Sequence, residues 1–444
     1  MNIGVISLGC VKNRVDTEEM LSFLQKDGFR FVSDPNTAEV LIVNTCGFIA
    51  SAKEESIDAI FEMAQYKKTG PCRVLCVTGC LAQRYGKELL EEIPEIDVLT
   101  GVSQYPQLSS YIRVALDGRR AGSTERGQDF TGCGRVLTTA PYTAYVRIAE
   151  GCDNRCAYCA IPLIRGGFRS RRKDSILEEM RELAAQGVKE QILISQDTSR
   201  YGADLKGASL SGLLQEAERI PGIEWLRVLY CYPDETGHEL IDAMAGSEKI
   251  CRYLDLPLQH ASPVILKKMN RRGDIRKIEE MLQYARERGF ALRTTMIVGF
   301  PSETDREFQE MMDFCARVQF DRLGAFSFSP EEETPACVMQ DQVPEEVKQR
   351  RLELLLGMQQ KISLKRNRLR IGENAEILIT GRKGMNYLGR SRWEAPDSDG
   401  LIQVKGSAPL EEGQMIRARI TSASEYDLGA EVSVTSGGEN ESAQ

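Results

Sequence analysis

The most informative stretch of this 444-residue chain is Ala149-Glu150-Gly151-Cys152-Asp153-Asn154-Arg155-Cys156-Ala157-Tyr158-Cys159. Gaps of three and two residues separate its cysteines, so one loop can turn three thiolates toward a common centre. A structural zinc site usually takes four ligands, whereas three thiolates suit a [4Fe–4S] cluster that keeps one iron open for chemistry. Three unrelated buried cysteines are the alternative, which is disfavoured because cysteine is scarce in ordinary sequences. The spacing therefore predicts an iron–sulfur enzyme.

Length and composition indicate a soluble protein of several domains. A chain of 444 residues is too long for one hydrophobic core. Hydrophobic residues at 42% and charged residues at 27% are typical of globular proteins. The apolar run at residues 3–8 is too short for a signal peptide or a membrane span, so we expect a cytoplasmic protein without membrane contact. In that compartment the thirteen cysteines are expected to be ligands and buried thiols rather than disulfides.

Residues 1–116 alternate short apolar runs with amphipathic helical patterns. The apolar runs cover residues 2–8, 40–44, 74–78 and 98–101, and the helical patterns cover residues 13–27, 52–67 and 83–92. Short buried strands that alternate with helices are typical of a parallel sheet covered by helices. We therefore predict an N-terminal α/β domain with a doubly wound parallel sheet.

A linker without the strand–helix pattern separates the first segment from a second one that shows the pattern again. Residues 117–139 are polar and rich in glycine, arginine and threonine, which indicates an exposed linker. Residues 140–369 then show candidate strands at residues 144–149, 191–195, 225–230, 253–257, 292–298 and 323–327. Six parallel strands with helices between them predict a partial (β/α)6 barrel, with its site at the carboxyl ends of the strands. Cys152 follows the first of these strands.

The pattern changes again near residue 370. Short alternating runs at residues 375–379, 401–404, 415–421 and 430–434 are separated by glycine and proline. They predict a small antiparallel β-barrel over residues 370–436. Residues 437–444 are expected to form a disordered tail.

A second set of cysteines follows three predicted strands of the N-terminal sheet. Cys10, Cys46 and Cys80 each lie just beyond the carboxyl end of a strand, and such ends converge on one crevice of a doubly wound sheet. Adjacent glycines would let the backbone approach a bulky inorganic cluster. On topology alone, buried free thiols remain the alternative, and Cys72 and Cys76 lie close enough to Cys80 to compete with it.

The other cysteines and the two histidines have weaker patterns. Cys133 lies in the linker and is expected to be an exposed thiol, whereas most of the remaining cysteines, Cys231 among them, are expected to be core residues. With His238 and His260 as the only histidines, a histidine-based metal site or triad is not expected. His260 follows a barrel strand, where a site residue and an ordinary hydrogen-bonded residue are both open interpretations.

The cysteine loop resembles the radical SAM signature, including the aromatic residue Tyr158 before its last cysteine. In that superfamily S-adenosylmethionine binds the open iron, and one electron from the cluster cleaves it to a 5′-deoxyadenosyl radical that abstracts a substrate hydrogen atom. The N-terminal cysteine domain, radical SAM core and small C-terminal barrel together resemble the methylthiotransferases, whose barrel is called a TRAM domain. The resemblance covers nearly the whole chain. It implies two [4Fe–4S] clusters, one held by Cys152, Cys156 and Cys159 and an auxiliary one held by Cys10, Cys46 and Cys80.

Two branches of this family differ in substrate. One modifies an isopentenyladenosine of tRNA, and the RimO branch methylthiolates the β-carbon of an aspartate in small-subunit ribosomal protein S-twelve. Val11 departs from the RimO pattern, in which proline is common at this position. Other stretches resemble the RimO branch, namely Ser7-Leu8-Gly9-Cys10, Ser195-Gln196-Asp197-Thr198, Leu229-Tyr230-Cys231-Tyr232-Pro233, Leu258-Gln259-His260-Ala261 and Asp321-Arg322-Leu323-Gly324-Ala325-Phe326.

The resemblance also implies reagents and partners. S-adenosylmethionine would serve as both methyl donor and radical source, ribosomal protein S-twelve as substrate, and flavodoxin or ferredoxin as electron donor. The alternative within the family is a tRNA methylthiotransferase. An electron-transfer or redox-sensing iron–sulfur protein would also use six cysteines, but it would not need a barrel with an open-iron loop.

The charge of the last segment bears on the choice of substrate. Residues 370–436 contain eight Lys and Arg against ten Asp and Glu, a net charge of −2. A barrel that binds RNA usually has a basic excess, because phosphate contacts supply much of its affinity. A mildly acidic barrel suits a lysine-rich ribosomal protein better. We therefore expect no strong nucleic-acid binding.

Four further residues are candidates for contacts with S-adenosylmethionine. Gly299 and Pro301 lie in a stretch that resembles the family segment holding this cofactor, and Gln196 lies beyond another strand. Tyr158 could pack beside the adenine. A simple loop before a helix is the alternative for the Gly299 stretch, and shielding of the cluster is the alternative for Tyr158. No separate catalytic side chain is predicted, because cluster-bound groups carry the chemistry.

Overall fold

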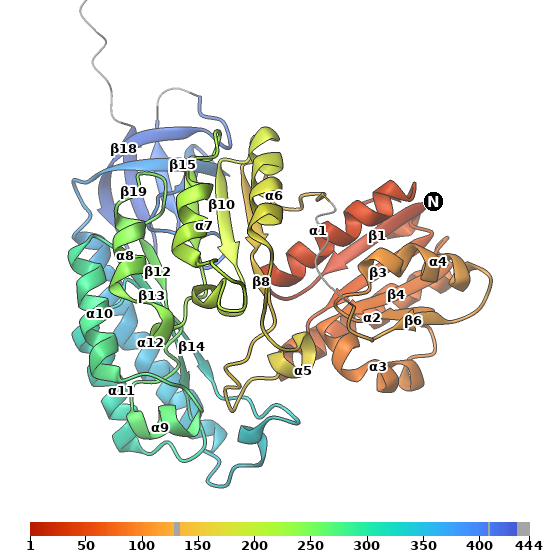
Figure 1. The fold of residues 1–444 in the computed structure, drawn as a ribbon, viewed down its shortest axis with the longest axis horizontal. Coiled ribbons are helices and arrows are strands. Elements are labelled where there is room, and N and C mark those ends of the chain that lie inside the picture. Colours follow the sequence, from red (N-terminus) through yellow and green to blue (C-terminus); the bar gives the residue numbers. More distant parts are fainter. Residues whose placement is uncertain (128–133, 407–408, 433–444) are drawn as a thin grey trace, which may run out of the picture.

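The protein consists of three units in chain order. The computed structural model describes residues 1–127, 134–406 and 409–432. They form an N-terminal α/β unit, a central open barrel and a small closed β-barrel (Figure 1). The expected tail at residues 437–444 and the thiol of Cys133 lie outside the described residues. No helix of the described part is long and apolar enough to cross a membrane.

A parallel sheet in the order β2-β1-β3-β4-β5-β6 forms the N-terminal unit and confirms the predicted doubly wound sheet. Leu41 and Val43 pack with α2 and α3 on one face, whereas Val40 and Ile42 pack with α1 and α4 on the other. Burial on both faces explains why the strands are continuous apolar runs. The elements are β1 (Asn2–Ser7), α1 (Val11–Lys26), β2 (Arg30–Phe31), β3 (Val40–Thr45), α2 (Ala50–Thr69), β4 (Val74–Gly79), α3 (Cys80–Glu92), β5 (Val98–Thr100), α4 (Leu108–Leu116) and β6 (Ala121–Ser123).

The expected linker is partly structured. Strand β6 pairs in parallel with β5 and forms the edge of the N-terminal sheet. Arg135 and Thr138 then bind the carboxylate of Glu18 on α1. The prediction of an exposed crossing missed this strand, because Ala-Gly-Ser has no apolar pattern.

Six parallel strands form the central barrel close to the predicted positions. They make two sheets, β7-β10-β11 and β12-β13-β14, which are linked by a parallel bridge between Leu226 and Ile250. Within the described residues β7 and β14 do not pair, so the barrel is incomplete, as expected. The strands are β7 (Thr143–Arg147), β10 (Glu190–Ile194), β11 (Trp225–Val228), β12 (Tyr253–Asp255), β13 (Ala291–Val298) and β14 (Arg322–Ser327), with a short hairpin of β8 (Ala149–Glu150) and β9 (Arg169–Ser170).

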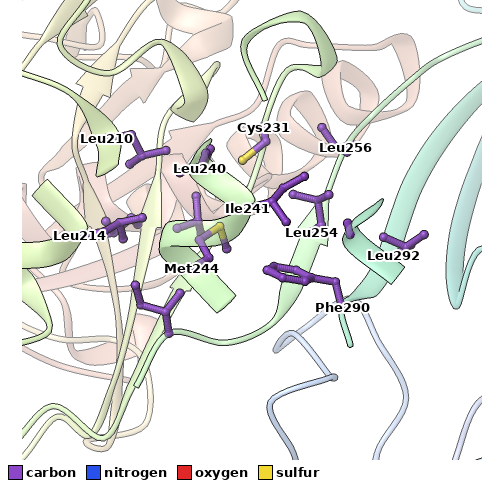
Figure 2. Packing of buried hydrophobic residues seen from close by; sticks show 14 of the residues in the cluster. Leu210, Leu214, Cys231, Leu240, Ile241, Met244, Leu254, Leu256, Phe290 and Leu292 are labelled. Atoms are coloured by element: carbon purple, nitrogen blue, oxygen red, sulfur yellow. The ribbon is translucent and has the colours of Figure 1, made fainter. Parts of the chain in front are cut away.

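Helices cover the outside of the central barrel. Figure 2 shows Ile241 and Met244 of α8 beside Leu254 of β12, with Phe290 and Leu292 close by. Apolar side chains fill this layer, and Cys231 and Cys315 are among them. The helices of this unit are α6 (Lys173–Ala185), α7 (Leu210–Ala217), α8 (His238–Ala245), α9 (Pro263–Lys268), α10 (Ile275–Glu287), α11 (Asp305–Val318) and α12 (Glu345–Arg368), together with the short α5 (Ile161–Arg165), which packs against α3 of the N-terminal unit instead.

The C-terminal unit is a closed barrel in the order β15-β16-β17-β19-β18. One of its pairs, β17 with β19, is parallel, whereas an all-antiparallel barrel was expected. Strand β16 was not predicted, because its five residues carry little alternation. The strands are β15 (Asn374–Lys383), β16 (Asn386–Arg390), β17 (Ile402–Lys405), β18 (Met415–Ala423) and β19 (Leu428–Val432).

Candidate active site

One cavity of about 360 Å³ lies between the N-terminal unit and the mouth of the central barrel. All six cysteines singled out from the sequence line it: Cys10, Cys46, Cys80, Cys152, Cys156 and Cys159. We call the first three the N-terminal set and the last three the loop set. The packing of two units thus brings together two groups of thiols that are far apart in the sequence.

The N-terminal set lies where three neighbouring strands end. Cys10 precedes α1, Cys46 follows β3 and Cys80 begins α3. A Cβ atom on Gly9, whose φ is +86°, would lie 2.7 Å from Cys46 Cβ, and one on Gly47 would lie 2.8 Å from the Leu81 backbone. These glycines therefore let the three cysteine loops approach one another, whereas the sequence suggested that they make room for a cluster.

Cys72 and Cys76, the alternatives to Cys80 as a cluster ligand, lie away from the cavity. Cys72 and Cys76 are buried in the hydrophobic cores on opposite faces of the N-terminal sheet. Neither residue lines the cavity, so the geometry favours Cys80 as the third member of the N-terminal set. Cys231 contributes to the barrel core, as expected, but it also lines the cavity.

Hydrogen bonds from neighbouring loops fix the loop set. Ala157 N–H donates to Met269 O at 2.9 Å, and Ala157 O accepts from Ala336 N–H at 2.8 Å. Asn154 Nδ2 donates to Asp197 Oδ2 at 2.7 Å. A loop of little regular structure is thereby held on several sides, which fixes the direction of its sulfurs.

Burial and positive charge set the chemistry of the thiols. Burial raises the pKa of Cys80 to about 12, of Cys152 to about 11 and of Cys159 to about 12. Such thiols keep their protons at neutral pH until a metal displaces them. A guanidinium lies beside each set, with Arg165 Nη2 at 3.3 Å from Cys80 Sγ and Arg271 Nη1 at 3.7 Å from Cys156 Sγ. These cations stabilise negative charge on sulfur.

Arg165 also joins the two units. It belongs to α5, directly after the loop set, and its side chain is 2% exposed. Its guanidinium lies 2.7 Å from Asp16 Oδ2, donates to Asn13 Oδ1 at 2.7 Å and lies 3.3 Å from Glu150 Oε2. Arg147 binds both Asp16 and Glu150. A buried ionic network therefore fixes the start of α1 against the barrel mouth.

The donor set suits a cluster better than a single ion. Within the described ranges, no three His, Cys, Asp or Glu side chains are placed to hold one metal ion. Sulfurs around a single zinc ion would each lie about 2.3 Å from it. Six cysteines line one cavity, three from each of two units, and such sets of three thiolates fit larger bodies such as [4Fe–4S] clusters.

The candidate contacts for S-adenosylmethionine divide into two groups. Tyr158 and Gln196 line the cavity, whereas Gly299 and Pro301 are not among its lining residues. Gln196 Nε2 donates to Glu150 Oε1 at 2.7 Å, and Gln196 Oε1 is buried without a hydrogen-bond partner in the described part of the chain. That oxygen can accept a hydrogen bond from a ligand.

Gly299 and His260 both contact the carboxylate of Glu303 and are not part of the cavity lining. Gly299 N–H donates to Glu303 Oε2 at 3.0 Å, and His260 Nε2 lies 3.1 Å from the same oxygen. His260 Nδ1 accepts from Ser262 N–H at 2.9 Å. His260 is fully buried and does not line the cavity, so the interpretation as an ordinary hydrogen-bonded residue holds.

Among the side chains of the cavity that sequence reasoning missed are three cations and one aromatic residue: Lys12, Arg165, Arg271 and Tyr230. Lys12 lies two residues from a cysteine and Arg165 lies six residues from another, but nearness in sequence does not say which way a side chain points. Tyr230 is in a stretch that resembled the family without being given a role. Arg271 follows α9 and carries no motif.

Comparisons with known proteins agree with this arrangement. Family models match residues 2–101 (Uncharacterized protein family UPF0004), 146–315 (Radical SAM superfamily) and 371–432 (TRAM domain). Fold and cavity thus define a radical SAM protein with an N-terminal cysteine domain and a TRAM barrel.

A relative from Desulforamulus reducens, named ribosomal protein uS12 methylthiotransferase RimO, is 48% identical over 97% of this chain and 99% of its own. A protein of the same name from Pelotomaculum thermopropionicum is 49% identical with the same coverage. The chain belongs to the RimO family.

Solved structures share the fold at low identity. The radical S-adenosylmethionine methyltransferase TsrM from Kitasatospora setae, with tryptophan and a cofactor analogue bound, has a TM-score of 0.56 and 15% identity. The match covers 86% of this chain and 79% of that one. The cobalamin-dependent radical enzyme OxsB has a TM-score of 0.51 and 12% identity over 81% of this chain and 56% of its own.

Proposed function

We propose that this chain attaches a methylthio group to the β-carbon of an aspartyl residue of ribosomal protein uS12. The observation that carries the proposal is the single cavity lined by both cysteine sets. An electron-transfer protein would have no need to place two sets of three thiolates around one cavity. The names of relatives that match this chain over nearly its full length support the same substrate.

We assign the loop set to one [4Fe–4S] cluster and the N-terminal set to a second one. When bound, the first would supply radical chemistry with S-adenosylmethionine, and the second would hold the sulfur that is transferred. Arg165 and Arg271 balance the negative charge of the thiolates. Gln196 Oε1 accepts a hydrogen bond from S-adenosylmethionine, and Tyr158 packs against it.

The C-terminal barrel presents a balanced surface. Three of its arginines, Arg370, Arg390 and Arg392, are engaged in ion pairs with carboxylates. By exposure alone, paired or not, its charged surface residues are Arg382, Lys383, Lys405, Arg417 and Arg419 against Glu373, Asp397, Glu411, Glu412 and Glu431. Without a basic excess the barrel suits a protein substrate better than an RNA backbone. We further propose a flavodoxin or ferredoxin as electron donor and, with a ribosomal protein as substrate, a cytoplasmic location.

Cysteine variants of the full chain test the cluster assignment. After anaerobic reconstitution, wild type should bind about eight irons, the content of two [4Fe–4S] clusters. Cys156→Ala should bind about four and form no 5′-deoxyadenosine. Cys46→Ala should also bind about four, form 5′-deoxyadenosine and yield no methylthiolated uS12. Cys76→Ala is the matched control, because this buried thiol lies outside the cavity. Full iron content in Cys46→Ala would refute its assignment as a ligand.

Mass spectrometry decides the substrate. Wild-type enzyme should add a methylthio group to purified uS12 and leave isopentenylated tRNA unchanged. Modification of the tRNA with an unchanged mass of uS12 would overturn the proposed substrate and favour the alternative.

A further inference from the structure

We propose that Lys12 binds the side-chain carboxylate of the aspartyl residue that is modified, and so selects this substrate. The inference rests on the proposed function. It concerns a lysine in the same cavity as the two cysteine sets, and it assigns that lysine to the protein substrate rather than to either cluster.

Lys12 spans the boundary between two units. It lies in the first turn of α1, two residues after Cys10, and it lines the cavity. Its Nζ lies 3.4 Å from the centre of the Tyr230 ring, and Tyr230 follows strand β11 of the central barrel. The ammonium group is therefore placed at the junction of the N-terminal unit and the barrel mouth.

The other two cations of the cavity are already engaged. Arg165 contacts Asp16 and Glu150, and Arg271 donates to the carbonyl oxygen of Pro257. For Lys12, the described residues provide no carboxylate oxygen within 4.0 Å of Nζ, and the ammonium group lies over the Tyr230 ring. Lys12 is thus the cavity cation with room for an added carboxylate.

Besides the Cys10 thiol two residues away, the acidic groups that act electrostatically on Lys12 are the carboxylates of Glu150 and Asp255, and both have other partners. Glu150 lies 2.9 Å from Arg147, and Asp255 lies 2.7 Å from Arg293. Because these acids are held by arginines, they do not compete directly for the ammonium group. An anion that enters the cavity would meet Lys12 without having to break an existing ion pair.

A route for a protein substrate reaches this lysine. A groove of about 610 Å³ runs between the N-terminal unit, the end of β11 and residues 396–398 of the C-terminal barrel. Cys10 and Tyr230 line both the groove and the cavity. A peptide segment in the groove could insert one side chain past Tyr230. In aspartate the carboxylate is bonded directly to the β-carbon, so binding the carboxylate at Lys12 holds the reacting carbon between the cysteine sets.

The same contact would explain selection between substrates. An isopentenyl group carries no charge, so it gains nothing from a cation at this position and would leave the ammonium group unpaired. An aspartate forms a charge-assisted hydrogen bond, which is stronger than one between neutral groups. We therefore expect the preference for a carboxylate to depend on Lys12.

The test compares two substrates with three enzymes. The substrates are uS12 and the uS12 variant in which the target aspartate is asparagine, and the enzymes are wild type, Lys12→Met and Lys26→Met. Lys26 makes the matched control, because the same change is placed in the exposed last turn of the same helix. We expect wild type and Lys26→Met to favour aspartate over asparagine in kcat/KM by about 10- to 100-fold. In Lys12→Met this ratio should fall to near one, and Lys12→Arg should restore part of it.

Two outcomes would overturn the inference in distinguishable ways. If Lys12→Met lowers kcat/KM equally for both substrates, the ratio is unchanged, and Lys12 acts on a cluster, on S-adenosylmethionine or on folding. If wild type modifies neither form of uS12 while it forms 5′-deoxyadenosine and modifies tRNA, the proposed function fails and the inference fails with it.

Discussion

Arg165→Met should loosen the contact between the N-terminal unit and the barrel. The change keeps an apolar stem of similar length and removes the guanidinium that binds Asp16 and Asn13 on α1 and Glu150 in the barrel. Asp16 is fully buried, and among the described residues Arg147 is the one cation that would still pair with it. Breaking a buried pair while its partner stays buried costs about 3–5 kcal/mol.

An arginine of α1 itself, Arg14, provides the matched control. Arg14 pairs with Asp397 across another part of the interface at 3.2 Å, but the two side chains are 39% and 55% exposed. Exposed pairs of this kind contribute less than about 1 kcal/mol. Arg14→Met should therefore have little effect, although it also removes a cross-unit ion pair.

Hydrogen exchange of the α1 amides measures the difference directly. In anaerobically reconstituted full-length protein, a loss of about 3–5 kcal/mol in the free energy of local opening speeds exchange by roughly 10²- to 10⁴-fold. Arg14→Met should change exchange by less than about tenfold. Iron content is measured on the same samples, so that cluster loss is not mistaken for weaker packing. Equal exchange rates in the two variants at equal iron content would refute the assignment of Arg165 as the main cross-link.

Two further predictions concern the C-terminal barrel and the cofactor. The pKa of Glu190 is lowered to about 2 because Arg390 and Arg227 bind its carboxylate, which is completely buried. Its stabilising effect of about 3 kcal/mol is therefore complete above pH 4.5 and is lost as the pH falls toward 2; calorimetry should show this loss in wild type and not in Glu190→Gln. For Gln196→Leu we expect the KM for S-adenosylmethionine in 5′-deoxyadenosine formation to rise about tenfold, the effect of one hydrogen bond. An unchanged KM would remove Gln196 from the cofactor site.

The sequence was most informative where local chemistry and topology determine the result. The spacing of Cys152, Cys156 and Cys159 predicted a three-thiolate loop, and all three line the cavity. Topology made Cys10, Cys46 and Cys80 candidates, because the ends of neighbouring parallel strands meet at one edge of a sheet, and the family resemblance then implied them as one set of ligands. Neither argument needed the arrangement of the three units.

Residues whose role depends on contacts between units could not be found in this way. Arg165 and Lys12 have ordinary sequence neighbours, and their positions in the cavity arise only when α1 packs on the barrel mouth. The parallel pair of β17 and β19 depends likewise on closure of a barrel between strands that are not consecutive. Long-range packing of this kind leaves no periodic pattern in the sequence.

The start of α1 carries residues of three kinds: a proposed cluster ligand, a cavity cation and an acid of the interface between units. Within seven residues it carries the thiol Cys10, the cavity cation Lys12 and the interface acid Asp16. A helix is a stiff element, so a displacement of α1 that weakens the pair of Asp16 with Arg165 also moves Cys10 and Lys12 relative to the loop set. The ionic network between the units therefore does more than stabilise the fold. It sets the distance between the two cysteine sets and the position of the proposed carboxylate-binding group together, so weakening it should impair sulfur transfer more than radical formation, which needs only the loop set.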